Sequence, residues 1–269
     1  MQASSAIRGH AAGVPFVALP PAAEPLDGPA PLVVTWHLMD PPRSEEAMAA
    51  ALPMSGLGAW RVYFGLPMHG GRAPEGGPEE FCRLAGEDYV LNVAEPVTEQ
   101  AATEFPGAVA DLRRQLSLPD SPVGVAGGSA GATVALEVLA RAEVPIGAAA
   151  LVSPVTQLGP AVGANERQFG VTYRWSERSR AVADRYDFVR RAGELCAPVL
   201  LVVGEHDDEA FREPAAALSE ALGDAGRLVT VPGMAHALAD EPGIEAAPQT
   251  GHAAMVDTEF TAWFQQHLR

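Results

Sequence analysis

A G-x-S-x-G motif at residues 127–131 constrains the fold of this chain more than any other feature. An apolar run at 122–126 precedes it, and a helix-forming run at 132–139 follows it. A serine between a strand and a helix lies on a sharp turn that exposes its hydroxyl at the edge of a sheet. The motif therefore predicts a strand, a tight turn carrying Ser129 and a helix. A glycine-rich turn with an incidental serine is the alternative.

Segments that suit strands alternate with segments that suit helices along most of the chain. We expect strands at 6–10, 14–19, 32–36, 59–66, 122–128, 146–152, 197–204 and 227–231, and helices from about 44 and at 95–117, 131–142, 214–222 and 255–268. Several strands are apolar on both faces, which is typical of a parallel sheet covered by helices on both sides. The pattern predicts a single α/β domain over residues 1–269, with a mostly parallel central sheet flanked by helices.

Residues 155–193 interrupt this alternation and are rich in arginine and aromatic side chains. The aromatic residues are Phe169, Tyr173, Trp175, Tyr186 and Phe188. We expect a small helical insertion that forms a cap or lid. A segment that only covers an edge of the sheet is the alternative.

The other residue types needed for nucleophilic catalysis follow Ser129, each directly after an expected strand. Two adjacent aspartates, Asp207 and Asp208, follow one strand, and His236 follows the last one. A serine hydroxyl is a poor nucleophile unless a base takes its proton, which a histidine oriented by a carboxylate can do. We therefore expect a triad of Ser129, Asp207 and His236. Asp208 is the alternative acid and His252 the alternative base.

Taken together, these motifs resemble the α/β-hydrolase superfamily, and above all its esterase and dienelactone-hydrolase-like members. The resemblance covers nearly the whole chain and rests on the serine motif, the acid loop at 204–207 and the histidine loop at 232–236. It implies the α/β-hydrolase fold. It also implies that Asp207 is the acid of the triad.

The resemblance further implies an oxyanion hole made of two backbone N–H groups. One belongs to Ala130, the residue after the nucleophile. For the second donor the family usually has His-Gly before the donor residue, whereas this chain has His37-Leu38-Met39. Met39 is our first choice for this donor and Leu38 the second.

The expected function is that of a serine hydrolase of the carboxylesterase type, cleaving a small-molecule carboxylic ester through an acyl-enzyme on Ser129. The resemblance implies no metal and no organic cofactor. An acyltransferase, a thioesterase or a peptidase would use the same triad. A non-catalytic binding protein on a hydrolase scaffold is a third hypothesis, disfavoured because all three triad residue types are present.

Charge and composition limit the partners. A net charge of −16 argues against nucleic acid and anionic membranes, and it fits a neutral or cationic substrate. All 18 basic residues are arginine, which excludes a catalytic lysine.

Cys82 and Cys196 form no C-x-x-C motif, and we expect buried thiols. Because residues 1–8 lack a signal-peptide pattern and no run could span a membrane, we expect a cytoplasmic protein. The sequence does not determine the oligomeric state.

Overall fold

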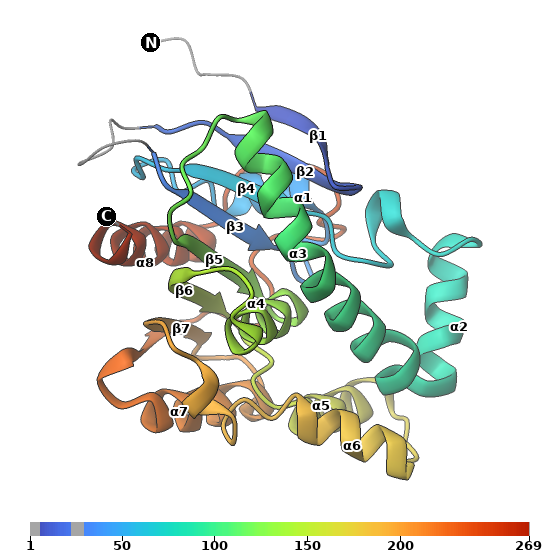
Figure 1. Cartoon of the computed structure of the whole chain (residues 1–269). Helices are drawn as coiled ribbons and strands as arrows, with labels where there is room; N and C mark the ends of the chain where they lie inside the picture. The colour runs from blue at the N-terminus through green and yellow to red at the C-terminus, as the bar shows by residue number, and fades with distance from the viewer. Residues whose placement is uncertain (1–5, 23–29, 269) are drawn as a thin grey trace.

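One sheet of eight strands forms the centre of the molecule in the computed structural model, which describes residues 6–22 and 30–268 (Figure 1). The strands are β1 (Ile7–Ala11), β2 (Val14–Leu19), β3 (Leu32–Trp36), β4 (Trp60–Phe64), β5 (Val123–Gly128), β6 (Ile146–Val152), β7 (Val199–Gly204) and β8 (Gly226–Val231). They lie in the order β1-β2-β4-β3-β5-β6-β7-β8. The β1–β2 and β2–β4 pairs are antiparallel and all other pairs are parallel, which confirms the expected sheet.

Helices cover both faces of this sheet. They are α1 (Glu45–Ala51), α2 (Gly77–Tyr89), α3 (Glu95–Gln115), α4 (Ala130–Arg141), α5 (Leu158–Phe169), α6 (Glu177–Arg185), α7 (Glu209–Leu222) and α8 (Gly251–His267). Short helical turns occur at η1 (Gly70–Arg72), η2 (Val90–Ala94), η3 (Ala192–Glu194) and η4 (Gly223–Ala225). Residues 23–29, which connect the expected strands at 14–19 and 32–36, lie outside the described residues, as do residues 1–5 and 269.

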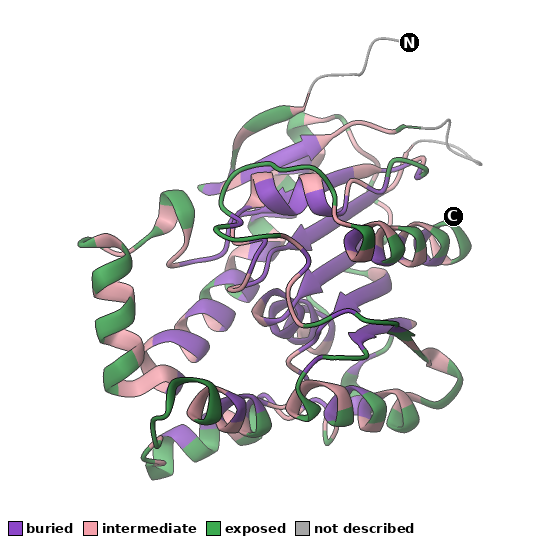
Figure 2. Ribbon diagram, turned by 180° about the vertical axis from the view of Figure 1, so that it is seen from behind, coloured by how far each residue is buried: buried purple, intermediate pink, exposed green. Residues whose placement is uncertain are grey.

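The core has two halves, one on each face of the sheet. Leu201 of β7 belongs to the cluster that includes residues of α3 and α4, whereas its neighbour Leu200 belongs to the cluster with α1 and α8. Successive side chains of a strand point to opposite faces, so a strand covered on both sides is apolar throughout. Figure 2 shows the strands buried at the centre and the exposed residues on the outer faces of helices and loops.

Some helix boundaries differ from the expected ones. The sequence pattern assigns no element to most of residues 77–94, where the structure has α2 and η2. The apolar residues of α2, Phe81, Leu84, Ala85 and Tyr89, are only partly buried against the core, and they lie in a segment rich in glycine and charged residues, so this stripe is a weak signal for a helix. α7 begins at Glu209 instead of near Pro214, since Asp208 caps its first turn and Pro214 lies inside the helix. α8 likewise begins earlier, at Gly251.

The expectation that both cysteines are buried is wrong. Cys82 and Cys196 are free and exposed. Cys82 lies on α2, which buries none of its residues completely, and Cys196 lies between η3 and β7.

Residues 155–193 contain α5 and α6. α5 packs against α7, and α6 packs against η2. The aromatic residues of this segment divide between core and surface: Tyr186 and Phe188 are fully buried, whereas Phe169 is 66% exposed. The segment is therefore partly built into the core.

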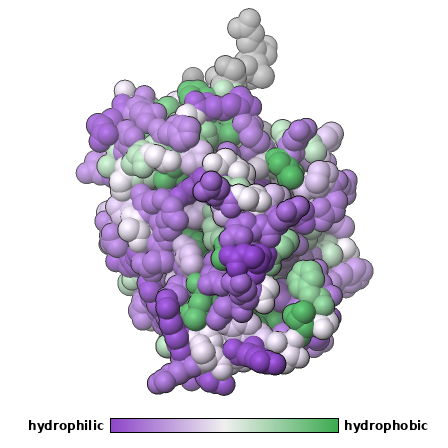
Figure 3. Space-filling model, turned by 90° about the vertical axis from the view of Figure 1, so that its right-hand side faces the viewer, coloured by the Kyte–Doolittle hydropathy of each residue, from purple (hydrophilic) through white to green (hydrophobic). Residues whose placement is uncertain are grey.

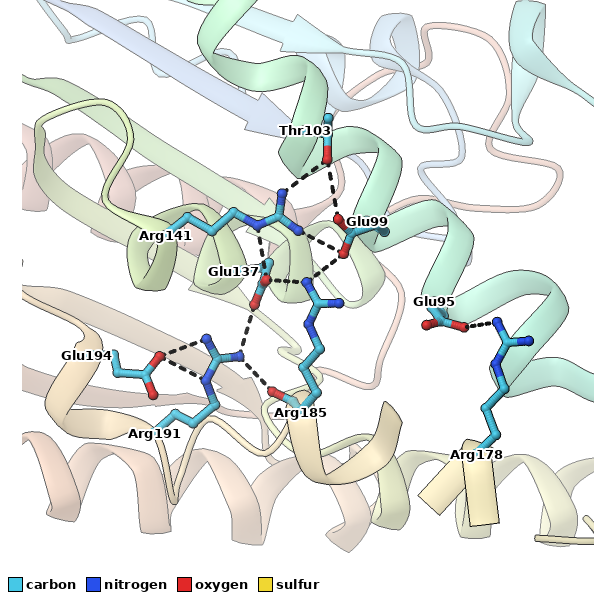
Figure 4. Close-up of polar contacts among 9 residues, drawn as sticks. All are labelled: Glu95, Glu99, Thr103, Glu137, Arg141, Arg178, Arg185, Arg191 and Glu194. Carbon is cyan, nitrogen blue, oxygen red and sulfur yellow. Dashed lines mark hydrogen bonds and ion pairs between the residues drawn. The ribbon is translucent and has the colours of Figure 1, made fainter. Parts of the chain in front are cut away.

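A buried ion network connects this segment to α4, the helix that follows Ser129 (Figure 4). The side chain of Glu137 is 3% exposed and accepts hydrogen bonds from Arg141, Arg185 and Arg191 at 3.0, 2.9 and 2.9 Å. Burial by itself would raise the pKa of Glu137, but the hydrogen bonds from the three arginines outweigh burial and lower that pKa. Glu137 is therefore a charged, buried anchor for two arginines of the 155–193 segment.

Replacing this anchor by Glu137→Gln is expected to lower the free energy of unfolding by about 3 kcal/mol, because three partly exposed guanidinium groups lose the buried charge that they share. Glu194→Gln is the matched control. The carboxylate of Glu194 is 50% exposed and pairs with Arg191 at 2.8 Å, so its loss should cost less than about 1 kcal/mol. Urea denaturation measures both values. Equal losses would contradict the importance that we assign to the buried centre of the network.

Candidate active site

Ser129 lies on the sharp turn between β5 and α4, as the motif predicts. Its backbone has φ 48° and ψ −115°, a conformation that is strained for a residue with a side chain. The flanking glycines permit this turn. A Cβ atom on Gly127 would lie 2.3 Å from the carbonyl oxygen of Gly131, and one on Gly131 would lie 2.5 Å from that of His37. Strand, turn and helix can therefore pack this closely only with glycine at both positions.

A chain of hydrogen bonds connects Ser129, His236 and Asp207. Asp207 follows β7 and His236 follows β8, so both lie at the same edge of the sheet as Ser129. The Ser129 hydroxyl donates to His236 Nε2 at 2.9 Å, and Nδ1–H of His236 faces both oxygens of Asp207 at 3.0 Å. The Asp207 side chain is 1% exposed. This arrangement leaves the Nε2 lone pair facing the serine hydroxyl, as a general base requires.

The two alternative residues occupy other positions. Asp208 caps α7 by accepting the N–H of Ala210 at 2.8 Å, and it pairs with Arg167 at 2.7 Å. The bond from Ala210 lowers the pKa of Asp208, with a smaller contribution from Arg167, although burial opposes the shift. His252 lies in the first turn of α8, and within the described residues it makes no hydrogen bond to Ser129.

Three backbone N–H groups are candidates for the oxyanion hole, and one of them is already hydrogen-bonded within the protein. Ala130 is the first residue of α4, so its N–H has no partner within the helix and lies at the positive end of the helix dipole. The N–H of Leu38 donates to the carbonyl of Pro42 at 3.1 Å. Leu38 is therefore unsuited to bind an oxyanion, which leaves Met39 as the candidate for the second donor.

His37 holds the loop that carries Met39. Its Nδ1–H donates to the Leu38 carbonyl at 2.6 Å, and its Nε2 accepts the N–H of Leu66 at 3.0 Å. Burial lowers the pKa of His37 to about 3, so the ring is neutral and can make both bonds. Since C=O and N–H point in opposite directions across a trans peptide, the bond to Leu38 also fixes the direction of the Met39 N–H.

Gly128 explains how this loop accommodates Leu38 in place of the family's usual glycine. A Cβ atom on Gly128 would lie 2.2 Å from Cδ1 of Leu38, whose side chain is fully buried. The glycine before the nucleophile thus makes room for the larger loop residue.

Sequence reasoning missed three residues around the site. Arg43 donates to the Met39 carbonyl at 3.0 Å and to both oxygens of Glu241 at 2.9 Å, which ties this loop to the histidine loop. Phe211 of α7 lies with its ring centroid 4.3 Å from that of His236. Asp40 Oδ2 lies 3.8 Å from His236 Nε2. Asp40 and Arg43 could have been found because they directly follow the His37-Leu38-Met39 segment. Nothing in the sequence singles out Phe211.

An open hollow of about 680 Å³ lies between α5 and α7, next to Asp207. Its lining residues are Pro160, Gly163, Arg167, Asp207, Asp208, Glu209, Ala210 and Glu213. Carboxylates therefore outnumber arginines in its wall. The face of the molecule drawn in Figure 3 is mostly hydrophilic, with hydrophobic residues in small separate areas.

Over residues 6–22 and 30–268, no helix combines the length and the apolar character needed to cross a membrane. The same part of the chain has no group of three or more His, Cys, Asp or Glu side chains placed to hold a metal ion.

Comparison with known proteins gives matches at three levels. A model of the prolyl oligopeptidase family (peptidase S9) matches residues 84–269. An uncharacterized protein of Mycobacterium tuberculosis is 30% identical over 148 residues, which cover 55% of this chain and 50% of the relative. This chain thus spans about half the length of the curated relatives it matches.

Two solved structures show the same fold at low identity. A puromycin-hydrolyzing peptidase of M. tuberculosis has a TM-score of 0.67 at 20% identity, covering 98% of this chain and 40% of the peptidase chain. A dienelactone hydrolase from Anabaena variabilis has a TM-score of 0.60 at 18% identity, covering 98% of both chains. These likenesses confirm the α/β-hydrolase fold expected from the sequence.

Proposed function

The chain belongs to the prolyl oligopeptidase family, within the α/β-hydrolase superfamily of serine hydrolases, and we propose that it is a carboxylesterase. The proposed reaction is hydrolysis of a small carboxylic ester through an acyl-enzyme on Ser129. The hydrogen-bonded chain from Asp207 through His236 to Ser129 carries this proposal. The likeness to a dienelactone hydrolase over the length of both chains supports a small ester as the substrate.

In acylation, His236 Nε2 takes the proton of Ser129 as Oγ attacks the ester carbonyl. Asp207 keeps the proton of the neutral ring on Nδ1 and stabilises the imidazolium that forms. The N–H groups of Ala130 and Met39 bind the oxyanion of the tetrahedral intermediate. One such donor contributes about 10²- to 10³-fold to kcat.

When the intermediate collapses, the bond between the carbonyl carbon and the leaving oxygen breaks, and His236 Nε2–H protonates that oxygen, which departs as the alcohol. A water molecule then takes the place of the alcohol, with His236 again acting as the base. The attack of this water molecule on the acyl-enzyme releases the carboxylic acid and restores the Ser129 hydroxyl. No step requires a group beyond these side chains, the two N–H groups and water.

A peptidase is the second candidate, favoured by the family's name and by the fold likeness to a peptidase of M. tuberculosis. The same triad would serve, with an amine as the leaving group. An acyltransferase or a thioesterase differs from the proposed esterase only in the acceptor or the leaving atom. Substrates that share one acyl group separate these activities.

We expect p-nitrophenyl butyrate to be hydrolysed with a kcat/KM at least about 10³-fold above that of butyryl p-nitroanilide. The two compounds share the acyl group and differ in the leaving atom, so their ratio reports the preference for esters. A fluorophosphonate probe should also label Ser129, as peptide mapping by mass spectrometry would show. Comparable rates on the anilide, or on short peptides, would favour the peptidase instead.

A further inference from the structure

A carboxylate outside the triad lies beside the reacting atoms. Oδ2 of Asp40 is 3.8 Å from Nε2 of His236, the nitrogen that also faces the Ser129 hydroxyl at 2.9 Å. The Asp40 side chain is 48% exposed, so a bound substrate can reach it. In the proposed mechanism Nε2 donates its proton to the leaving group. Asp40 therefore lies next to the position from which the leaving group departs.

The charge of Asp40 has no arginine partner among the described residues. Arg43, three positions further along the loop, is occupied by Glu241 and by the carbonyl of Met39. The carboxylate is therefore free to pair with a substrate. It also lies one residue after the proposed oxyanion donor Met39, where an uncompensated negative charge opposes the formation of an oxyanion.

The backbone around Asp40 is held in place on both sides. The Leu38 N–H donates to the Pro42 carbonyl at 3.1 Å. The Pro41 carbonyl accepts the N–H groups of Leu238 and Ala239 at 2.9 and 3.4 Å, in the loop that carries His236. Asp40 is thus fixed relative to the histidine, unlike a charged residue on a free surface loop.

Two aromatic side chains lie against neighbours of Asp40. The Phe211 ring packs on His236 with a centroid distance of 4.3 Å. The Tyr89 hydroxyl lies 4.0 Å from Met39 Sδ. Burial raises the pKa of Tyr89 to about 12, and the negative charge of Asp40 adds to the increase. A carboxylate with aromatic rings nearby is the combination that suits a substituted ammonium group.

We propose that Asp40 is a specificity-determining residue, which selects substrates that carry a protonated or quaternary amine within a few bonds of the scissile carbonyl. Such a cation pairs with Asp40 and cancels the repulsion between its carboxylate and the oxyanion. The net charge of −16 favours the approach of a cation as well. This inference rests on the proposed serine hydrolase function and adds the class of substrate.

Two pairs of isosteric esters test the preference for a cation. Choline butyrate and 3,3-dimethylbutyl butyrate differ only in the charge of the leaving group. The 3,3-dimethylbutyl esters of alanine and of isobutyric acid differ only in an ammonium on the acyl side. For at least one pair we expect the wild type to favour the cation about tenfold in kcat/KM, and Asp40→Asn to bring that ratio close to one. The responding pair tells which side of the ester carries the cation.

Asp224→Asn is the matched control. It changes the net charge by the same amount as Asp40→Asn. Asp224 is exposed in η4, directly before β8, whereas His236 follows β8, so the two residues lie at opposite ends of this strand. The control should keep the wild-type ratio. The rate of fluorophosphonate labelling at Ser129 gives a second readout, which does not depend on turnover of these esters. Tetramethylammonium chloride should speed labelling in the wild type and in Asp224→Asn, relative to sodium chloride at equal ionic strength, because the cation bound at Asp40 cancels the repulsion between its carboxylate and the charge that develops on the phosphoryl oxygen. It should have no such effect in Asp40→Asn.

The results separate this inference from the function on which it rests. If Ser129 is labelled but tetramethylammonium has no effect and each pair of esters reacts equally, the role of Asp40 is wrong and the hydrolase proposal stands. A preference that survives in Asp40→Asn also overturns the role of Asp40. If Ser129 is not labelled and no ester is hydrolysed, the hydrolase proposal fails, and the inference about Asp40 fails with it.

Discussion

Ser129→Ala is expected to lower kcat for p-nitrophenyl butyrate by about 10⁴-fold or more and to abolish labelling by a fluorophosphonate. Without the hydroxyl no acyl-enzyme can form. The remaining activity over water would come from binding and from the proposed oxyanion donors Ala130 and Met39. Ester hydrolysis by purified protein and mass spectrometry of the labelled peptide measure the two effects.

The variant should keep the fold of the wild type. The Ser129 side chain does not cap α4, and its hydrogen bond with His236 is its one side-chain bond within the described residues. Ser117→Ala is the matched control, since Ser117 is exposed and also has a positive φ, of 53°. Both variants should melt close to the wild type, whereas only Ser129→Ala loses activity. Full esterase activity in Ser129→Ala would refute the proposed nucleophile.

The second large effect is expected for Asp207→Asn, which should lower kcat/KM by about 10³- to 10⁴-fold. Both carboxylate oxygens lie 3.0 Å from Nδ1 of His236, and one of them also accepts the N–H of Asp208 at 2.8 Å. An amide at this position can donate to Nδ1 and so favour the tautomer with its proton on Nε2. That tautomer cannot accept the proton of Ser129. Steady-state kinetics of the purified variant measure the loss.

Asp208→Asn is the control for the neighbouring carboxylate. Asparagine caps helices as well as aspartate does, so α7 should keep its first turn. The pair with Arg167 would be lost, but Asp208 is 39% exposed there, and such pairs contribute about 1 kcal/mol or less. We expect activity within a few-fold of the wild type. If Asp208→Asn were inactive while Asp207→Asn kept its activity, Asp208 would be the acid of the triad.

Much of the fold can be predicted because its causes are local. β5, β6 and β7 are apolar over their whole length, and β3 is apolar except for Thr35, since helices cover both faces of the sheet. Such runs stand out in the sequence. α2 is not predicted, because its apolar stripe is short and only partly buried and lies in a segment rich in glycine and charged residues. The start of α7, at Glu209, differs from the expected start at 214 for another reason. Its cap, Asp208, is one of two adjacent aspartates, and the sequence does not show which of the two side chains accepts a hydrogen bond from the first turn of the helix.

For the candidate site, the sequence by itself determined the residue types and the turn that carries Ser129. The glycines at 127 and 131 are required by close approaches of the backbone within one strand–turn–helix unit and the neighbouring β3, so the motif predicts the turn directly. The order of serine, acid and histidine along the chain likewise follows from the order of the strand ends.

Only the tertiary structure decided which of several similar groups meet in space. It placed Asp207 against His236 and turned Asp208 toward Arg167. In the folded chain the N–H of Leu38 donates to the Pro42 carbonyl, and the carboxylate of Asp40 lies beside the ring of His236. Each of these outcomes depends on the direction of one side chain or one peptide in a loop. Hydrogen bonds between loops that are distant in the sequence set those directions, and no local pattern encodes them.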